Sequence, residues 1–338
     1  MPTATRRPQG KPLFTILNCA DRYISTMNRF RPARIGPSFL TLFCCGSIHA
    51  AQTVNLPSWV CTHPDAIFVS EFDTAEVPVP RDPTQGSGGT TGTTTHTVHI
   101  AGLGTGVQKY YLYVPTSYAP SQTYPFVLAL HGTAPYASRS GYASDVLTAW
   151  STVAANGQFI VAAPVADEEV TVDGQAGATW SVPPDSPSDY DLFAAVLADA
   201  ESAYNIDRTR IYVWGFSSGG SVAYDLGLND YSTTFDASTL AAYSVSAGAL
   251  GGLACSYSPN TCPALLQSQS RKVPVDIHVG TADDPGYSYA EVDHTDFVNA
   301  GWADGSTVFL STFPGGHTYS ASDLQLAWTH LCPCAVTP

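Results

Sequence analysis

Charged side chains are scarce in this sequence. Asp, Glu, Lys and Arg make up 12% of its 338 residues, about half of the share in an average soluble domain. Basic residues are the rarer kind, since 14 Lys and Arg stand against 28 Asp and Glu and give a formal net charge of −14. A surface of that sign repels phosphate backbones and anionic membranes. The composition therefore excludes nucleic acid as a partner and leaves neutral molecules and polymers as candidates.

Long apolar runs are also lacking. Beyond the first fifty residues, no segment approaches the roughly 20 apolar residues that a membrane-spanning helix needs, so we expect no stable membrane insertion. Apolar residues are nevertheless abundant, because 44% of the chain is hydrophobic and 11% is aromatic, which is enough for a sizeable core. The 28 glycines and 25 prolines predict many loops, in one large domain or two small ones.

The first fifty residues differ from the rest in charge and predict a targeting segment. They contain seven of the Lys and Arg residues and a single acidic one. From Met27 the sequence passes through a basic stretch and a short apolar stretch to Ala50-Ala51, which is the layout of a secretory signal peptide. We expect Met27 to be the true start and the protein to be secreted, to the extracellular space or the periplasm. Pro37 disfavours the alternative, an uncleaved anchor.

Three regions are expected along the chain. Residues 1–50 hold the N-terminal extension and the signal peptide. Residues 51–95 form a Pro-rich arm that ends in the Gly/Thr tract GSGGTTGTTT, a composition typical of a flexible linker. Residues 96–338 form the single folded domain.

The cysteines beyond residue 50 predict disulfides rather than a metal site, because export places thiols in an oxidising compartment. Cys255 and Cys262 are close in sequence and are expected to pair. Cys61 is expected to pair with Cys332 or Cys334, which leaves one cysteine over, and the sequence alone does not fix the connectivity. No histidine or second cysteine pair stands at zinc spacing from Cys332 and Cys334, so we predict no metal.

Short apolar runs alternate with helical patterns in the folded domain. Strands are expected at residues 96–100, 110–114, 124–130, 159–163, 211–214, 275–279 and 308–313. Helices are expected at 190–204, with Ser188 as N-cap, and at 218–226 and 320–331. Near-solid apolar runs suit parallel strands that are covered on both faces. The pattern predicts an α/β domain with a doubly wound, mostly parallel sheet, whose ligands bind at the carboxyl ends of the strands.

The strongest chemical signal is the segment Gly215-Phe216-Ser217-Ser218-Gly219. It matches G-x-S-x-G in the required context, with a predicted strand before it and a predicted helix after it. In this motif the serine occupies a sharp turn that lifts its hydroxyl off the sheet, and glycines stand where side chains would collide. Ser217 is therefore the predicted nucleophile of an α/β-hydrolase fold. The alternative is an ordinary strand-to-helix turn.

A serine hydroxyl needs a base, and in this fold the order along the chain is Ser, acid, His. Four histidines follow the nucleophile: His278 inside a strand, His294 in an acidic segment, His317 and His330. His317 lies in a glycine loop directly after the last strand and is the predicted base. The acid is expected after the preceding strand, where Asp283 is favoured over Asp284.

The oxyanion hole and the substrate contacts of a hydrolase site are predicted from less specific sequence signals. An oxyanion hole needs two backbone N–H donors, and we nominate the amides of Ser218 and Thr133, the latter because His131-Gly132-Thr133 ends the first core strand. His131 itself is predicted to be structural. Aromatic residues near strand ends are the candidates for substrate contacts: Trp180, Tyr136, Tyr142 and Tyr287.

Several segments resemble the extracellular poly(3-hydroxybutyrate) depolymerase and feruloyl esterase family. They are residues 191–220, Leu130-His131-Gly132, Gly280-Thr281-Ala282-Asp283 and Gly316-His317-Thr318, which lie within about 96–335. The resemblance implies the α/β-hydrolase fold, a triad of Ser217, Asp283 and His317, an acyl-enzyme on the serine, and no cofactor. It also implies a substrate-facing position for Trp180.

The sequence departs from this family at two places and leaves other activities open. Ala178-Thr179 precede Trp180 where a cysteine is usual, and Asp284-Pro285-Gly286 replace a more apolar continuation. The expected function is a serine carboxylic-ester hydrolase that acts on a polyester or a feruloylated polysaccharide. The alternatives are an acetylxylan-type esterase, an acyltransferase, a serine peptidase or a non-catalytic secreted binding protein.

Overall fold

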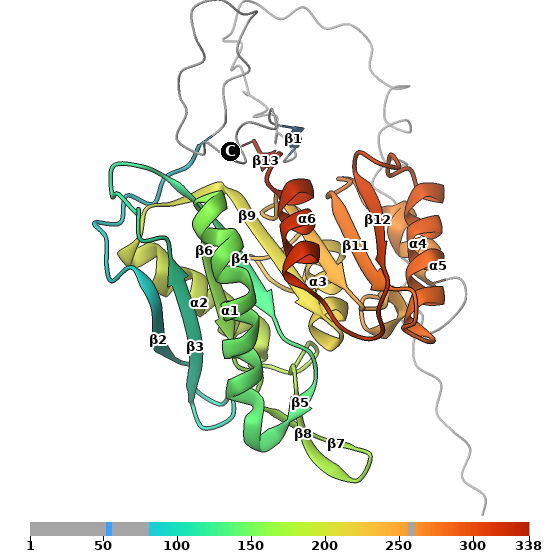
Figure 1. The fold of residues 1–338 in the computed structure, drawn as a ribbon, viewed down its shortest axis with the longest axis horizontal. Helices are drawn as coiled ribbons and strands as arrows, with labels where there is room; N and C mark the ends of the chain where they lie inside the picture. Colours follow the sequence, from blue (N-terminus) through green and yellow to red (C-terminus); the bar gives the residue numbers. More distant parts are fainter. Residues whose placement is uncertain (1–51, 56–80, 256–260, 338) are drawn as a thin grey trace, which may run out of the picture. The chain divides into compact units, whose positions relative to one another are not determined.

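The structure is a computed structural model that describes residues 52–55, 81–255 and 261–337 (Figure 1). The predicted signal peptide and Cys61 lie outside the described residues. Among the described residues, no helix is both long enough and apolar enough to cross a membrane.

Eight strands form the central sheet, and their spatial order is β12-β11-β10-β9-β4-β6-β3-β2. They are β2 (Gly92–His99), β3 (Val107–Val114), β4 (Tyr124–Leu130), β6 (Ile160–Pro164), β9 (Ile206–Phe216), β10 (Ala242–Ser246), β11 (Val275–Gly280) and β12 (Val308–Phe313). The six strands from β12 to β6 are parallel, while β2 and β3 add an antiparallel edge. The mostly parallel sheet predicted from the sequence is thereby confirmed.

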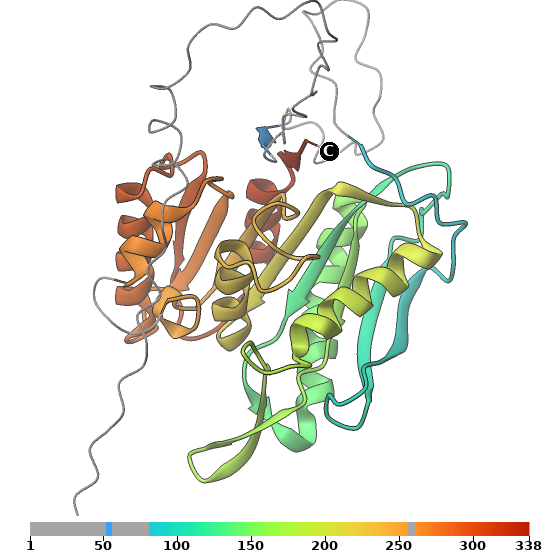
Figure 2. The ribbon, with the colours of Figure 1, turned by 180° about the vertical axis from the view of Figure 1, so that it is seen from behind.

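Helices cover both faces of this sheet (Figures 1 and 2). They are α1 (Arg139–Gly157), α2 (Asp189–Ala203), α3 (Ser218–Leu228), α4 (Thr261–Ser268), α5 (Gly286–Asn299) and α6 (Ala321–Leu331). Helices α1 and α6 pack on one core cluster, and α2, α3 and α5 pack on the other. Strand β4 contributes side chains to both clusters. Leu128 belongs to the cluster under α2, α3 and α5, and Val127 belongs to the cluster under α1 and α6. Its continuous apolar sequence follows from burial on both sides.

Local sequence sets where two of the helices begin. Ser188 caps α2 by accepting the N–H of Tyr190, and Asp191 reaches back to the N–H of Ser188. Ser320 and Asp323 form the same reciprocal pair at the start of α6. Such capping boxes satisfy N–H groups that have no partner inside the helix. The predicted N-cap at Ser188 is confirmed.

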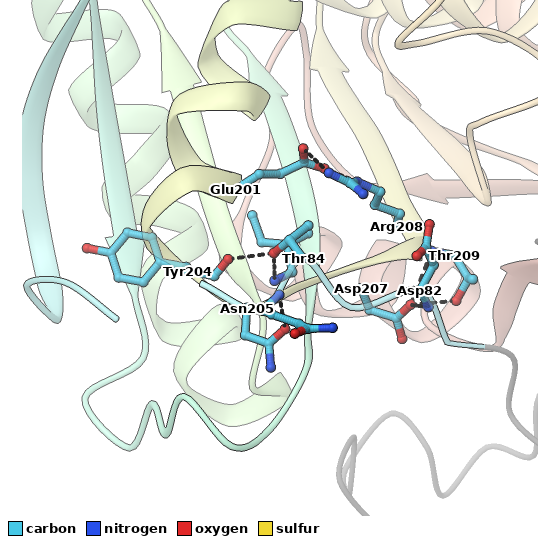
Figure 3. A network of polar contacts seen from close by, with 10 residues as sticks. Asp82, Thr84, Glu201, Tyr204, Asn205, Asp207, Arg208 and Thr209 are labelled. Atoms are coloured by element: carbon cyan, nitrogen blue, oxygen red, sulfur yellow. Dashed lines mark hydrogen bonds and ion pairs between the residues drawn. The ribbon is translucent and has the colours of Figure 1, made fainter. Parts of the chain in front are cut away.

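The Gly/Thr tract is not the free linker that its composition predicts. Residues 92–95 are part of β2, and the segment before them bonds to the chain around the start of β9 (Figure 3). Thr84 donates its hydroxyl to the carbonyl of Tyr204 at 2.7 Å, and the Gln85 N–H donates to the Asn205 side chain at 2.9 Å. Gly86 lies so close to Tyr204 that a Cβ would come within 2.4 Å of its backbone. Glycine here permits close packing against the domain.

Two small sheets complete the architecture. Strand β1 (Thr53–Asn55) pairs antiparallel with β13 (Cys334–Val336). Strands β5 (Ala134–Pro135), β8 (Gln175–Thr179) and β7 (Glu168–Val172) form a three-stranded sheet. This second sheet begins directly after β4, at the end to which the parallel strands point (Figure 1).

The cysteines within the described residues are either disulfide-bonded or free. Cys255 and Cys262 form a disulfide. Cys332 is disulfide-bonded, and Cys334 is a buried free thiol whose pKa is raised to about 12 by burial. A thiol with so high a pKa is protonated at neutral pH and is a poor nucleophile.

Asp293 on α5 should make stability depend on pH. Its carboxyl is buried, accepts the N–H of Leu250 at 2.8 Å, and has its pKa raised to about 7 because burial penalises the charged form. Between about pH 4 and 7 the folded chain keeps a proton that the unfolded chain releases, so this contribution to stability falls as pH rises. We expect the stability advantage of Asp293→Asn over the wild type to be about 1–3 kcal/mol larger at pH 8 than at pH 5.

Urea unfolding at both pH values measures this difference. Asp173→Asn, at an exposed position between β7 and β8, serves as the control and should shift the free energy of unfolding equally at pH 5 and pH 8. A difference between wild type and Asp293→Asn that is the same at both pH values would contradict the assignment.

Candidate active site

Ser217 stands at the turn from β9 into α3. Its backbone angles are φ 55° and ψ −119°, a region that costs a residue with a Cβ on the order of 1–3 kcal/mol. The turn is held by the Ser217 N–H, which donates to the carbonyl of Ser246 at 2.8 Å, and by the Ser221 N–H, which donates to the Ser217 carbonyl. The strained turn that the motif predicts is present. It places Ser217 at the N-terminus of α3, where backbone N–H groups and the helix dipole favour negative charge.

The two glycines of the motif are required by contact distances. A Cβ on Gly215 would lie 2.0 Å from the carbonyl oxygen of Gly219. A Cβ on Gly219 would lie 2.6 Å from the carbonyl oxygens of both Leu130 and His131. All of these neighbours are backbone atoms that cannot rotate away, so only glycine lets the strand, the helix and the end of β4 meet here.

We expect Gly215→Ala to lower the free energy of unfolding by about 3 kcal/mol or more, because the added methyl displaces backbone in a packed region. Gly141→Ala is the matched control, since this glycine lies in α1 and a methyl group added to it would meet no atom within 4 Å. That change should be neutral or stabilise by up to about 1 kcal/mol through helix propensity. Urea unfolding compares the two, and equal effects would contradict the packing explanation.

His317 joins Ser217 to Asp283 through its two ring nitrogens. Its Nε2 lies 2.8 Å from the Ser217 Oγ, and its Nδ1 lies 2.9 Å from the Asp283 Oδ2. Asp283 is buried, whereas the His317 side chain is half exposed. The two loops are tied together, because the Ala282 N–H donates to the carbonyl of Gly315 at 2.7 Å. These are the three residues that the sequence predicts, and the structure brings them into one hydrogen-bonded chain.

Asp284, the competing candidate for the acid, is exposed. Within the described part of the chain, the carboxylate that bonds to the His317 Nδ1 is that of Asp283 and not that of Asp284. The space under the Asp283 carboxylate is shaped by Gly286, where a Cβ would come within 2.7 Å of that group. The glycine at 286 thus leaves room for the Asp283 side chain.

Phe216 supports His317 in a way that the sequence did not indicate. The two rings lie with centroids 5.0 Å apart, and Tyr319 packs edge-on against Phe216 at 5.0 Å. The variable position of the motif therefore carries a side chain that flanks the imidazole. The sequence shows that an aromatic residue stands beside Ser217. It does not show that this ring contacts His317, which lies three strands further along the chain.

The predicted oxyanion loop lies next to Ser217, the predicted nucleophile. Strands β4 and β9 are neighbours, with Leu130 opposite Gly215, so the residues after β4 lie beside Ser217. A Cβ on Gly132 would come within 2.9 Å of the Ser217 Cβ. Strand β4 leads to α1 on one face of the sheet and β9 leads to α3 on the other. The carboxyl ends of these two neighbouring strands therefore mark the point at which strand order reverses, the usual place for a ligand in such sheets.

His131 is buried and neutral. The backbone N–H of Ala166 donates to its Nε2 at 3.1 Å, so this nitrogen carries no proton. Its Nδ1 therefore holds the proton and donates to the carbonyl of Gly132 at 2.6 Å. Burial lowers the pKa of His131 to about 4, in agreement with these partners. The burial of His131 and its two backbone hydrogen bonds agree with the structural role predicted for it.

The predicted substrate role of Trp180 is wrong in this structure. The side chain is 4% exposed and belongs to the core, where its Nε1–H donates to the carbonyl of His131 at 2.9 Å. Tyr142 is 43% exposed on α1. Tyr136 is half-buried under Arg139 and donates its hydroxyl to Asp167, and Tyr287 is half-buried on α5. These three tyrosines stay candidates for substrate contact.

Other polar clusters in the described residues lie away from the triad. Asp276 accepts from His278 at 2.5 Å and from His330 at 2.7 Å. These three side chains offer ligand atoms within 4.8 Å of one another, but the Asp276 oxygens are already engaged by the two histidines. A cavity of about 500 Å³ lies at the start of β9, lined by residues that include Arg208, Thr209 and Glu201. Ser217 is at the opposite end of that strand.

Comparisons with known proteins find similarity to esterases. No protein-family model matches the chain. The sequence is 26% identical over 183 residues to a bifunctional acetylxylan esterase/xylanase of Neocallimastix patriciarum, and the match covers 54% of this chain and 22% of that enzyme. A solved ferulic acid esterase is similar with a TM-score of 0.52 and 18% identity, over 71% of this chain and 97% of the other. The chain adopts the α/β-hydrolase fold.

A second solved structure extends the similarity in fold. The ferulic acid esterase of Anaeromyces mucronatus, solved in complex with ferulic acid, has a TM-score of 0.50 and 16% identity, over 78% of this chain and 95% of the other. The α/β-hydrolase fold accounts for the strand order and for the turn from β9 into α3 that carries Ser217. The candidate residues Ser217, Asp283 and His317 also follow one another in the order Ser, acid, His that is usual in this fold.

Proposed function

We propose that this protein is a serine carboxylic-ester hydrolase. The observation that carries the proposal is the hydrogen-bonded chain from the Ser217 Oγ through His317 to Asp283. Asp283 holds the imidazole with a proton on Nδ1, which leaves Nε2 free to accept the proton of the serine hydroxyl. Such a serine can attack an ester carbonyl and form an acyl-enzyme.

The negative charge of the tetrahedral intermediate needs preorganised donors. Ser218 opens α3 directly after the nucleophile, and Thr133 follows Gly132, which lies against Ser217. Their backbone N–H groups form the proposed oxyanion hole. His317 then gives its proton to the leaving alcohol, and a water activated by the same imidazole releases the acid.

The proposed natural substrate is an ester carried by plant polysaccharide, either a feruloyl or an acetyl ester. The named activities of the related proteins, acetylxylan esterase and ferulic acid esterase, support this class. A polyester of the poly(3-hydroxybutyrate) type is the second candidate, which the sequence motifs around Ser217 and His317 favour. Export from the cell, as the sequence up to Ala51 predicts, would bring the enzyme to either polymer.

A panel of substrates tests the proposal on the purified protein. Hydrolysis of p-nitrophenyl acetate tests ester cleavage, and release from methyl ferulate, acetylated xylan and amorphous poly(3-hydroxybutyrate) distinguishes the substrate classes. An anilide of acetate tests the peptidase alternative, and added alcohol acceptors test acyl transfer. Absence of ester cleavage by folded protein would overturn the proposal. Sequencing of the exported N-terminus tests secretion, and a mature chain that keeps residues before Met27 would contradict the assigned start.

A further inference from the structure

Two successive carbonyl groups at the end of β4 are each held by a buried ring N–H. The carbonyl of His131 accepts the indole N–H of Trp180 at 2.9 Å. The carbonyl of Gly132 accepts the Nδ1–H of His131 at 2.6 Å. A peptide group is planar and trans, so fixing a carbonyl also fixes the N–H of the next residue, which points the opposite way. The direction of the Thr133 N–H is thus set by the hydrogen bond to the Gly132 carbonyl.

The two donors are themselves held in place. The His131 ring is fixed at its far side by the Ala166 N–H, and it packs on Trp180 with ring centroids 4.8 Å apart. The Trp180 ring also packs edge-on against Phe193 of α2. The residue after Trp180, Ser181, exchanges two hydrogen bonds with Asp189: its N–H donates to the carboxylate at 2.7 Å, and its carbonyl accepts the Asp189 N–H at 2.9 Å.

We propose that His131 and Trp180 are positioning residues that aim the Thr133 amide at the oxyanion. The proposal rests on the proposed esterase function, and it gives Trp180 a role in place of the substrate contact that the sequence suggested. A glycine at 132 is needed for the approach to Ser217, but glycine leaves the backbone free to rotate. The two ring donors remove that freedom. Neither ring touches the reacting atoms, so both act through the backbone.

The neutral state of His131 is part of this role. Because its pKa is lowered to about 4 by burial, the ring keeps a single donor and a single acceptor throughout the range in which an esterase works. A protonated ring would lose its bond to the Ala166 N–H. The aim of the Thr133 amide is therefore insensitive to pH above about 5.

Removing an oxyanion donor outright costs about 100- to 1000-fold in kcat. Loosening the peptide that carries the donor should cost less, about 10- to 100-fold, with KM nearly unchanged. Affinity for phenylboronic acid, which forms a tetrahedral anion on a reactive serine, should fall by a similar factor.

The test compares Trp180→Phe with Trp302→Phe. Trp302 is also a buried indole that donates to a backbone carbonyl, that of Val273 at 2.7 Å. It packs on Phe297 of α5 rather than on His131. Both variants lose one equivalent hydrogen bond and should lose similar stability in urea. We expect only Trp180→Phe to lose kcat and boronate affinity. Equal losses in both variants, or wild-type kcat in Trp180→Phe, would overturn the proposal.

A second pair keeps the proposal testable if Trp180→Phe does not fold. His131→Asn places an amide N–H near the lost Nδ1, whereas His131→Leu provides no donor. We expect Asn to retain several-fold more kcat than Leu, and equal activity in the two would exclude the role of the imidazole. Crystal structures of wild type and variants give a readout that needs no activity. A rotated Gly132–Thr133 peptide would support positioning even if the wild type cleaves no ester, whereas an unmoved peptide would contradict it.

Discussion

Replacement of Ser217 by alanine should lower kcat/KM for p-nitrophenyl acetate by about 10⁴-fold or more while the protein stays folded. The Oγ accounts for nucleophilic attack, and no other hydroxyl lies within hydrogen-bonding distance of the His317 Nε2 among the contacts of the described residues. Alanine also fits the turn, because the Ser217 Cβ is already accommodated at its strained φ. A small residual rate should persist from the oxyanion hole and from substrate binding.

Ser221→Ala is the control for this experiment. Ser221 lies one helical turn further along α3, where its hydroxyl donates to the carbonyl of Ala249 at 3.1 Å, so its loss should affect stability slightly and catalysis little. Circular dichroism and urea unfolding establish that both variants are folded. A Ser217→Ala protein with more than about a tenth of wild-type activity would exclude the serine mechanism, since removal of a nucleophile costs far more than that.

The sequence was sufficient to predict strands whose side chains are apolar on both faces. The run at 124–130 coincides with β4, and the run at 159–163 is displaced by one residue from β6. Strand β10 escaped prediction because its sequence, AYSVS, contains two buried serines. Ser244 is satisfied by donating to Asp276 on the neighbouring strand at 2.9 Å. A hydroxyl with its partner on another strand does not look like core in a single sequence.

Helix α1 shows a different limit. Its buried residues Val146, Leu147, Trp150 and Val153 follow the spacing of three and four, so a helical signal is present. The helix nevertheless begins without a side-chain cap, and its boundaries carry no local marker. Helix α2 was predicted closely because Ser188 marks its first turn as an N-cap. The capping box at Ser320 marks the start of α6 in the same way, although the prediction of that helix did not use it.

The candidate triad was predictable because each of its members follows a strand of a parallel sheet. The carboxyl ends of such strands meet at one edge, so residues 217, 283 and 317 converge although they are far apart in sequence. The position of Trp180 was predicted wrongly because this residue does not follow a strand of the parallel sheet. It follows β8 of the small sheet and turns inward to the carbonyl of His131. Whether an aromatic ring faces solvent or core depends on tertiary contacts that a single sequence does not contain.

Asp283→Asn should reduce kcat by about 10³- to 10⁴-fold with little change in KM. Asn can offer its amide N–H toward the His317 Nδ1, which then holds the ring in the tautomer that has its proton on Nε2, the wrong one for accepting the serine proton. The loss of the negative charge also removes stabilisation from the imidazolium that forms in the transition state. Asp283 is buried beside Gly286, so the change is nearly isosteric and the fold should be retained.

Asp284→Asn is the matched control for this substitution. The neighbouring carboxyl is exposed and carries the same formal charge, so both variants change the net charge of the loop equally. Any effect of bulk electrostatics on the reaction would appear in both, whereas loss of the bond at 2.9 Å to His317 affects only Asp283→Asn. A large loss of kcat in Asp284→Asn together with a small one in Asp283→Asn would transfer the role of the acid to Asp284 and require a rearranged loop in the working enzyme. The difference between the two variants therefore measures how much of the rate depends on orientation and charge at the His317 Nδ1.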